Sequence, residues 1–193
     1  KILFSPSWRK DLIGEYENNT RQLLEKKFLA SDFYKEINAF LNSPELAKLL
    51  EKYDYQLDFK NHPIFKDYDK YFNVNNPRIS VTQKIDDMDK YALMITDYSS
   101  IVFDFVYLDR PILYFVPDYE LFRAGITHDY NELDLPLEEA FGALAMNADE
   151  LLANLEKLIV NDMKPDEVYA KRCKEFFISK SGHCQKLYEL LTK

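Results

Sequence analysis

Four short polar clusters each follow an apolar segment of the chain, and three of them have residue types that suit an anion. The clusters are Ser5-Pro6-Ser7-Trp8-Arg9, Lys60-Asn61-His62-Pro63, Asp97-Tyr98-Ser99-Ser100 and Pro117-Asp118-Tyr119. Serine hydroxyls and the side chains of His, Lys and Arg donate hydrogen bonds to phosphate oxygens. Because the chain has a net charge of −8, donors gathered at these places predict an anionic ligand.

The cluster that ends in Ser99 and Ser100 is the best local candidate, because a predicted strand turns there into a predicted helix. Free backbone N–H groups and the positive end of the helix dipole would face a ligand at such a turn. The two serine hydroxyls would add further donors. The alternative is that Asp97 or Ser99 only caps the helix, which is a common use of both residue types.

Other residues of the clusters also leave two interpretations open. His62 is either a solvent-facing turn residue, or a phosphate ligand that could assist a leaving phosphate as a general acid. Trp8 either covers a base or stacks in the core. Arg9 either clamps a phosphate or pairs with a surface acid. His128 and His183 are expected to be structural.

Composition excludes several classes of function. The chain has 4 glycines, none close enough to another for a dinucleotide-binding or Walker A loop. An excess of 33 Asp+Glu over 25 Lys+Arg argues against a duplex nucleic-acid binder. No apolar run reaches the roughly 20 residues of a membrane span. We therefore expect one cytoplasmic globular domain over residues 1–193, without a metal or other cofactor.

Apolar patterning predicts that strands alternate with helices. Strands are expected at Ile2–Phe4, Tyr55–Phe59, Ile79–Val81, Leu93–Thr96, Pro111–Val116 and Ala143–Met146. Helices are expected at Thr20–Leu29, Asp32–Leu41, from Ser43, at Asp86–Tyr91, Ile101–Leu108, from Asn147, and at Asp166–Phe177 and Gly182–Leu191. Irregular or surface segments are expected at Asp11–Asn19, Tyr68–Phe72 and Tyr119–Leu137.

This alternation predicts an α/β fold, a Rossmann-like parallel sheet with helices on both faces. Ligands of such sheets bind outside the carboxyl ends of the strands, at the point where the strand order reverses. The polar clusters follow the strands, so we expect the ligand at this edge of the sheet.

Three motifs, taken in order, resemble those of the CDP-glycerol glycerophosphotransferase family, the teichoic acid polymerases and primases. The segment Ser5–Arg9 resembles the A-P-T-W-R element of that family, and Lys60–Pro63 is similar to its K-x-H-P element. The segment Ile95–Asp104 looks like its most specific motif, I-T-D-Y-S-S-x-x-F-D. The resemblance extends from Ser5 to about Leu191.

The resemblance implies a GT-B architecture, in which two Rossmann-like domains face each other, with this chain as the C-terminal, nucleotide-binding half. The implied reaction transfers glycerol phosphate from CDP-glycerol, or ribitol phosphate from CDP-ribitol, to an acceptor hydroxyl and releases CMP. It also implies an N-terminal domain in the same protein, and a lipid-linked glycan or polymer acceptor at the inner face of the cell membrane. Nucleic acid is not an expected partner.

Nine donor-site positions follow from the resemblance, and no metal ligand. The residues expected to contact the pyrophosphate are Ser7, His62, Ser99 and Ser100. The residues expected to shape the site, or to hold the cytidine and ribose, are Lys60, Asp97 and Asp104. Trp8 and Arg9 complete the donor-binding set, and His62 is the candidate catalytic residue. The catalytic base is expected in the N-terminal domain.

One segment departs from the family pattern. Where the family commonly has R-G-F-Y and then P-G-P, this chain has Arg123-Ala124-Gly125 and Leu135-Pro136-Leu137. The identity of the transferred polyol therefore stays open. Two alternative functions also stay open: a GT-B glycosyltransferase that uses a nucleotide sugar, and a non-catalytic nucleotide-binding domain.

Overall fold

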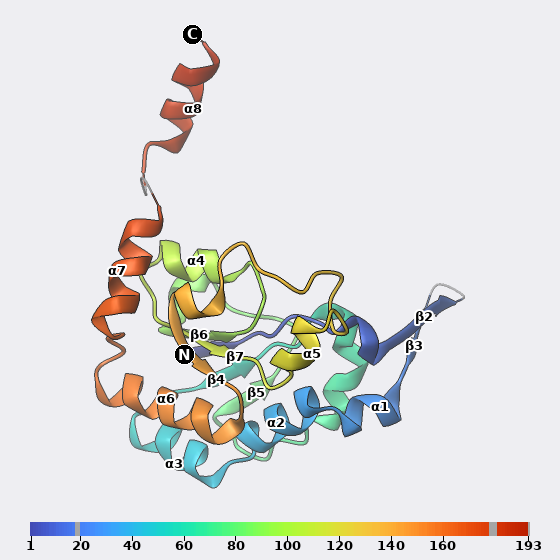
Figure 1. Ribbon diagram of the computed structural model, residues 1–193. Coiled ribbons are helices and arrows are strands. Elements are labelled where there is room, and N and C mark those ends of the chain that lie inside the picture. The colour runs from blue at the N-terminus through green and yellow to red at the C-terminus, as the bar shows by residue number, and fades with distance from the viewer. Residues whose placement is uncertain (18–19, 178–180, 193) are drawn as a thin grey trace.

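A computed structural model describes residues 1–17, 20–177 and 181–192 of the protein (Figure 1). Its centre is a six-stranded sheet in which every strand runs parallel to its neighbours. The strands are β1 (Ile2–Phe4), β4 (Leu57–Phe59), β5 (Ile79–Val81), β6 (Leu93–Thr96), β7 (Ile112–Phe115) and β8 (Gly142–Ala145). Across the sheet their order is β5-β4-β1-β6-β7-β8.

This order is the doubly wound arrangement of Rossmann-like folds, in which the chain starts near the centre and fills first one side and then the other. The reversal lies between β1 and β6, where Phe4 pairs with Ile95. The loops that follow these two strands begin at Ser5 and Asp97. The structure confirms the predicted α/β class, and it places two of the polar clusters at the switch point.

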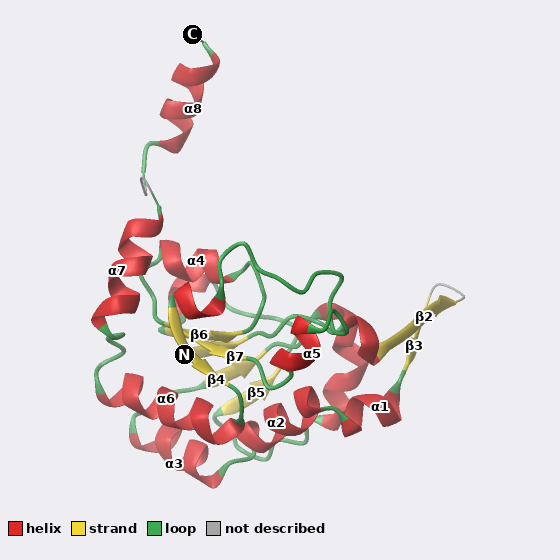
Figure 2. Ribbon diagram, in the orientation of Figure 1, coloured by secondary structure: helices red, strands yellow, loops and turns green. Residues whose placement is uncertain are grey.

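Helices cover both faces of the sheet, as Figure 2 shows. The core on one face packs against α2 (Asp32–Leu41), α3 (Pro44–Lys52) and α6 (Ala148–Val160). The core on the other face packs against α4 (Val102–Tyr107) and α7 (Glu167–Phe176). Alternate residues of a strand point to opposite faces, so Ile2 and Phe4 belong to the first core and Leu3 to the second.

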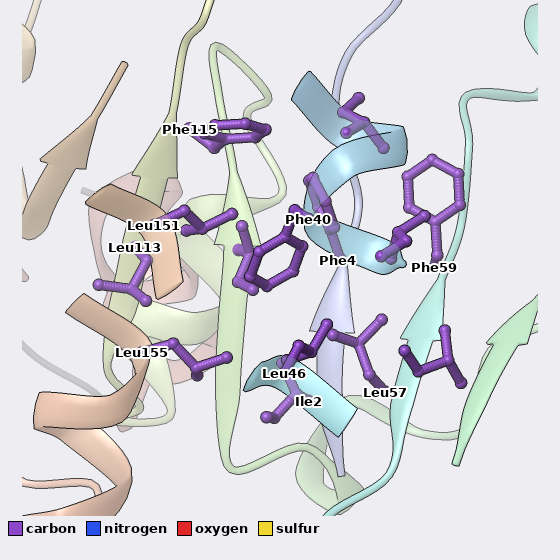
Figure 3. Close-up of a cluster of buried hydrophobic side chains, with 14 of the residues drawn as sticks. Ile2, Phe4, Phe40, Leu46, Leu57, Phe59, Leu113, Phe115, Leu151 and Leu155 are labelled. Atoms are coloured by element: carbon purple, nitrogen blue, oxygen red, sulfur yellow. The ribbon is translucent and has the colours of Figure 1, made fainter. Parts of the chain in front are cut away.

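Phe4 lies at the centre of the first core (Figure 3). Its ring contacts Phe59 of the neighbouring strand at a centroid distance of 5.1 Å, and it contacts Phe40 of α2 and Phe115 of β7 at 5.9 Å each. These edge-on contacts fill the space between the sheet and the helices. They fix the position of β1, and therefore the start of the loop that follows it.

The remaining elements lie around this core. The helices are α1 (Glu25–Ala30), α5 (Tyr119–Arg123) and α8 (His183–Leu191), with 3₁₀ helices at Lys10–Leu12, Pro63–Tyr71, Met88–Lys90 and Leu137–Glu139. The strands β2 (Ile13–Glu17) and β3 (Thr20–Leu23) form an antiparallel hairpin that projects from the body in Figure 1. No helix within the described ranges is long and apolar enough to span a bilayer.

The prediction of a helix over Thr20–Leu29 is wrong for its first turn. The structure has strand β3 at Thr20–Leu23, and the helix begins only at Glu25. The segment predicted as an irregular loop, Asp11–Asn19, instead contains part of a 3₁₀ helix and strand β2; Asn18 and Asn19 lie outside the described residues. Pairing between β2 and β3 overrides the local helical spacing, because strand preference depends on cross-strand neighbours.

Two further segments are more ordered than the sequence predicts. Tyr68, expected at the surface, is fully buried; its ring stacks on Phe28 at 4.0 Å and its hydroxyl donates to the Leu12 carbonyl at 2.8 Å. The first part of the segment expected to be irregular forms α5, because Phe122 is buried and stacks on Tyr98 at 4.0 Å. In contrast, the helix predicted from Asp86 is reduced to three 3₁₀ residues.

Candidate functional site

Asp97 joins the loops that follow β1 and β6. Its Oδ1 accepts the backbone N–H groups of Ser7 at 2.8 Å and Tyr98 at 2.6 Å, and its Oδ2 accepts a hydrogen bond from Arg9 Nη1 at 2.7 Å. The carboxylate is buried, with the residue only 1% exposed. Asp97 therefore holds the two loops together, because all three bonds fix loop backbone or a buried side chain.

Arg9 does not fit the predicted role of a phosphate clamp or of a partner for a surface acid. Its side chain is fully buried, and its Nε and Nη2 donate to the two carboxylate oxygens of Asp118 at 2.6 and 3.0 Å. The guanidinium also lies over the Phe33 ring, 4.5 Å from its centroid. Burial opposes the charge, but Asp118 and Asp97 outweigh it and raise the pKa of Arg9. Arg9 thus ties together the loops after β1, β6 and β7.

The turn from β6 into α4 leaves several donors free. The Ser99 and Ser100 carbonyls accept the first N–H bonds of the helix, from Val102 at 3.2 Å and Phe103 at 3.1 Å. No hydrogen bond within the described ranges engages either serine hydroxyl, or the backbone N–H of Ser99, Ser100 or Ile101. Ser99 is half-buried and Ser100 is exposed, so both hydroxyls are accessible for a ligand.

The capping alternative for Asp97 and Ser99 is not supported, because the start of α4 has no side-chain cap bond within the described residues. The helix has only six residues and begins at Val102. A helix this short has a small dipole, because the dipole is the sum over its aligned peptide units. The hydroxyls and free N–H groups therefore matter more at this turn than the helix dipole that the sequence suggested.

His62 lies at the carboxyl end of β4 and is half-buried. Its Nδ1 accepts the backbone N–H of Ile64 at 3.2 Å, so the neutral ring carries its hydrogen on Nε2. Burial, and then the positive charge of Lys60, lower the pKa of His62. At neutral pH the ring is therefore an uncharged N–H donor, with the charge of the site supplied by Lys60. No described side chain forms an ion pair with Lys60.

Trp8 connects the loop after β1 with the first core and with His62. It is half-buried and packs on the first core, and its ring lies 6.4 Å from that of His62. The two strand-end loops after β1 and β4 are thus in contact, as those after β1 and β6 are. Core packing of Trp8 agrees with one of its two expected roles.

A cavity of about 420 Å³ opens beside Ser99 and Ser100. Its walls are mainly apolar, and its lining includes Tyr98, Phe103, Tyr114, Leu135, Phe141 and Phe176. The lining includes Asp97 among the candidate residues, but not Ser7, Lys60, His62 or Asp104. Asp104 is exposed on α4, and within the described ranges its side chain forms no hydrogen bond or ion pair with another candidate.

Sequence reasoning missed two residues of this arrangement. The sequence assigns Asp118 no role in the site, yet Asp118 is the bidentate partner of Arg9. His128 was expected to be structural, but its Nε2 lies 3.2 Å from the Ser7 hydroxyl and its Nδ1 lies 2.9 Å from that of Thr127. No local signal marks His128, because the contact joins residues that are 121 positions apart.

Comparison with known proteins gives a match over the whole chain. Residues 1–193 match the family model described as CDP-glycerol:poly(glycerophosphate) glycerophosphotransferase. The minor teichoic acid biosynthesis protein GgaB of Bacillus subtilis is 25% identical over 183 residues, which are 92% of this chain and 19% of that protein. The teichoic acid poly(glycerol phosphate) polymerase of Bacillus spizizenii is 26% identical over 98% of this chain and 44% of its own length.

Solved structures show the same fold. The wall teichoic acid polymerase TagF superposes with a TM-score of 0.56 at 20% identity, over 97% of this chain and 41% of that one. A variant of TagF gives a TM-score of 0.60 at 16% identity over the same fractions. The chain therefore spans less than half the length of these relatives.

Proposed function

We propose that this chain, which belongs to the CDP-glycerol:poly(glycerophosphate) glycerophosphotransferase family, is the donor-binding domain of a transferase that uses CDP-glycerol. The enzyme would transfer glycerol phosphate to an acceptor hydroxyl in the synthesis of teichoic acid or a capsular polymer. The observation that carries the proposal is the pair of free hydroxyls, Ser99 and Ser100, at the switch point of a chain that matches this family throughout.

The proposed reaction is a displacement at phosphorus. The acceptor oxygen bonds to the phosphorus that carries glycerol, the bond from this phosphorus to the bridging oxygen breaks, and CMP leaves with the bridging oxygen. Such a transfer depends mainly on positioning and on stabilising charge on the phosphate oxygens. Donors without a metal can supply both.

The described side chains divide these tasks. The hydroxyls of Ser99 and Ser100 and the Nε2–H of His62 would hold pyrophosphate oxygens, and Lys60 would offset their negative charge. A bound pyrophosphate raises the pKa of a nearby imidazole. His62 could therefore take up a proton when the donor binds and pass it to the leaving CMP, as a general acid.

The acceptor and the catalytic base belong to a further proposal. Relatives of this chain are more than twice its length, so a second domain has room to complete the cleft as the N-terminal half of a GT-B enzyme. That half would supply the base and hold a lipid-linked acceptor at the inner membrane face. Ribitol remains an alternative polyol, because the Arg123–Gly125 segment departs from the family pattern.

Donor competition on the full-length protein tests this function. CMP release would be measured with CDP-glycerol and with CDP-ribitol, and release of UDP or UMP with UDP-N-acetylglucosamine, each with a polyol-phosphate polymer as acceptor. We expect release from a CDP-polyol and none of UDP or UMP from the sugar nucleotide. Turnover of the UDP-sugar alone would support the glycosyltransferase alternative, and binding of CDP-glycerol without any turnover would support a non-catalytic domain.

A further inference from the structure

Among the described residues, the Ser7 hydroxyl has two hydrogen-bonding neighbours. Arg9 Nη1 lies 3.1 Å from Ser7 Oγ, and His128 Nε2 lies 3.2 Å from it on another side. A guanidinium can only donate, so Arg9 occupies one acceptor site of this oxygen, through an N–H shared with the Ser7 carbonyl. The direction of the bond with His128 decides where the Ser7 hydrogen points.

Thr127 settles the direction of that bond. Thr127 is 1% exposed, and its hydroxyl lies 2.9 Å from His128 Nδ1. Within the described ranges the Thr127 hydroxyl has no other partner. If Nδ1 carried the hydrogen, the buried Thr127 O–H would lack an acceptor, which is costly. Thr127 therefore donates to Nδ1, and the hydrogen of the neutral imidazole lies on Nε2.

With this tautomer, the Ser7 oxygen accepts from both His128 and Arg9. A hydroxyl has one donor and two acceptor sites. Both acceptor sites are then used inside the protein, and the O–H can only donate away from these two partners. Ser7 lies in the loop that follows β1 at the switch point, where its N–H is already fixed by Asp97.

We propose that His128 is a positioning residue, which aims the Ser7 hydroxyl hydrogen at an anionic group bound at the carboxyl edge of the sheet. The inference rests on the proposed function, because it takes that anion to be the donor's pyrophosphate. It deepens that function by assigning a task to a residue outside the three motifs.

The surroundings hold the imidazole in one orientation. The Tyr98 and Phe122 rings meet it edge-on at 5.0 and 5.5 Å. The turn after α5 uses Gly125 with a φ of +70°, which brings Thr127 back so that its carbonyl accepts the Lys10 N–H at 2.8 Å. Burial, and then the charge of Arg9, lower the pKa of His128 to about 4, so the ring stays neutral at physiological pH.

Two substitutions of His128 separate the two ring nitrogens. In His128→Gln the side-chain amide NH₂ can take the place of Nε2 and keep the bond to Ser7. In His128→Asn the shorter amide can reach only the place of Nδ1 and keeps the bond to Thr127. His128→Gln and His128→Asn would be made in the full-length protein, together with Ser7→Ala and the double variant Ser7→Ala/His128→Asn. CD spectra would confirm that each variant is folded.

Dissociation constants would be measured by calorimetry for CDP-glycerol and, separately, for inorganic pyrophosphate, with UDP-N-acetylglucosamine as the comparison nucleotide. We expect His128→Asn and Ser7→Ala each to weaken binding by about tenfold, with His128→Gln within about threefold of the wild type. The double variant should be no weaker than Ser7→Ala, because both changes remove one interaction. A merely structural role would give equal effects for Asn and Gln, and additive effects in the double variant.

Each outcome bears on a different claim. If CDP-glycerol binds but the effects of Ser7→Ala and His128→Asn add up, the positioning role is overturned and the proposed function stands. If pyrophosphate shows the predicted pattern but CDP-glycerol binds no better than UDP-N-acetylglucosamine, the positioning role stands and the donor assignment fails. Absence of binding by both ligands to the wild type overturns both.

Discussion

Two free hydroxyls, those of Ser99 and Ser100, carry most of the proposed donor binding at the scale of single residues. A hydrogen bond to a charged group contributes about 1.5–3 kcal/mol, so Ser99→Ala and Ser100→Ala should each raise the dissociation constant for CDP-glycerol by about 10- to 150-fold. Ser80→Ala is the matched control, because Ser80 is an exposed serine on β5. Equal affinities for all three variants would refute the assignment.

Arg9 stabilises the site from within, so its removal should affect stability. Replacing it by Met leaves the carboxylates of Asp97 and Asp118 buried without their partner. We expect the free energy of unfolding, from urea titration, to fall by about 3–5 kcal/mol. Lys157→Ala breaks an exposed pair with Asp166 and should cost at most about 1 kcal/mol. A small loss of unfolding free energy for Arg9→Met would mean that Arg9 does not pair with Asp97 and Asp118 as described.

His128 should make stability depend on pH. Burial and the charge of Arg9 lower its pKa to about 4, from an ordinary value near 6.5. Between these values the unfolded chain binds a proton that the folded chain does not, so the free energy of unfolding falls as the pH falls from 6.5 to 4. The slope from this group is at most about 1.4 kcal/mol per pH unit.

Urea titrations at several pH values would measure this slope. Well above pH 6.5 both states are neutral at this residue, and the slope from His128 vanishes. His62 has a lowered pKa as well, so it contributes to the same window. The difference between the wild type and His128→Gln isolates the contribution of His128. Parallel pH profiles of the two proteins would show that the ring is not buried as described.

Secondary-structure elements differ in how much they contribute to stability. Leu155 of α6 is fully buried in the first core, whereas Leu190 of α8 is 72% exposed. Leu155→Ala should cost about 2–5 kcal/mol, because it removes packed atoms and leaves a cavity. Leu190→Ala should change the free energy of unfolding by no more than about 0.5 kcal/mol. A large loss for Leu190→Ala in the 193-residue chain would show that α8 packs against something.

The sequence predicted the central strands because their signal is local. β6 and β7 are continuous apolar runs, and the helix predicted from Asn147 forms as α6, with the Asn147 side chain accepting the Glu150 N–H at 2.9 Å. The hairpin of β2 and β3 could not be predicted in this way, because pairing between the two strands and not apolar spacing defines it. Helix α5 was missed because the burial of Phe122 depends on distant residues.

The candidate site also combines features that have a local sequence signal with features that depend on distant contacts. The motifs placed Ser7, His62 and Ser99 at strand ends, and the sheet order puts those strand ends at one edge. The burial of Arg9 and its pairing with Asp118 join residues that are 109 positions apart, so no spacing rule reveals them. The sequence located the strand-end clusters, but it did not reveal which residues hold the loops in place.

For the molecule as a whole, we expect this chain to bind the donor nucleotide and another part of the protein to be needed for transfer. The chain contains a complete sheet with a core on each face, but it spans less than half of its relatives' length. We expect the 193-residue chain alone to bind CDP or CMP weakly and to transfer nothing. CMP release from CDP-glycerol in the presence of acceptor would measure this. Turnover by the isolated chain would contradict the expectation that transfer needs another part of the protein.

A crystal structure of the full-length protein with CDP-glycerol is the most direct test of the donor site. We predict that pyrophosphate oxygens lie within about 3 Å of the Ser99 and Ser100 hydroxyls and of His62 Nε2. A different position of the nucleotide would contradict it. One such position is the groove of about 410 Å³ beside Arg78, which directly precedes β5.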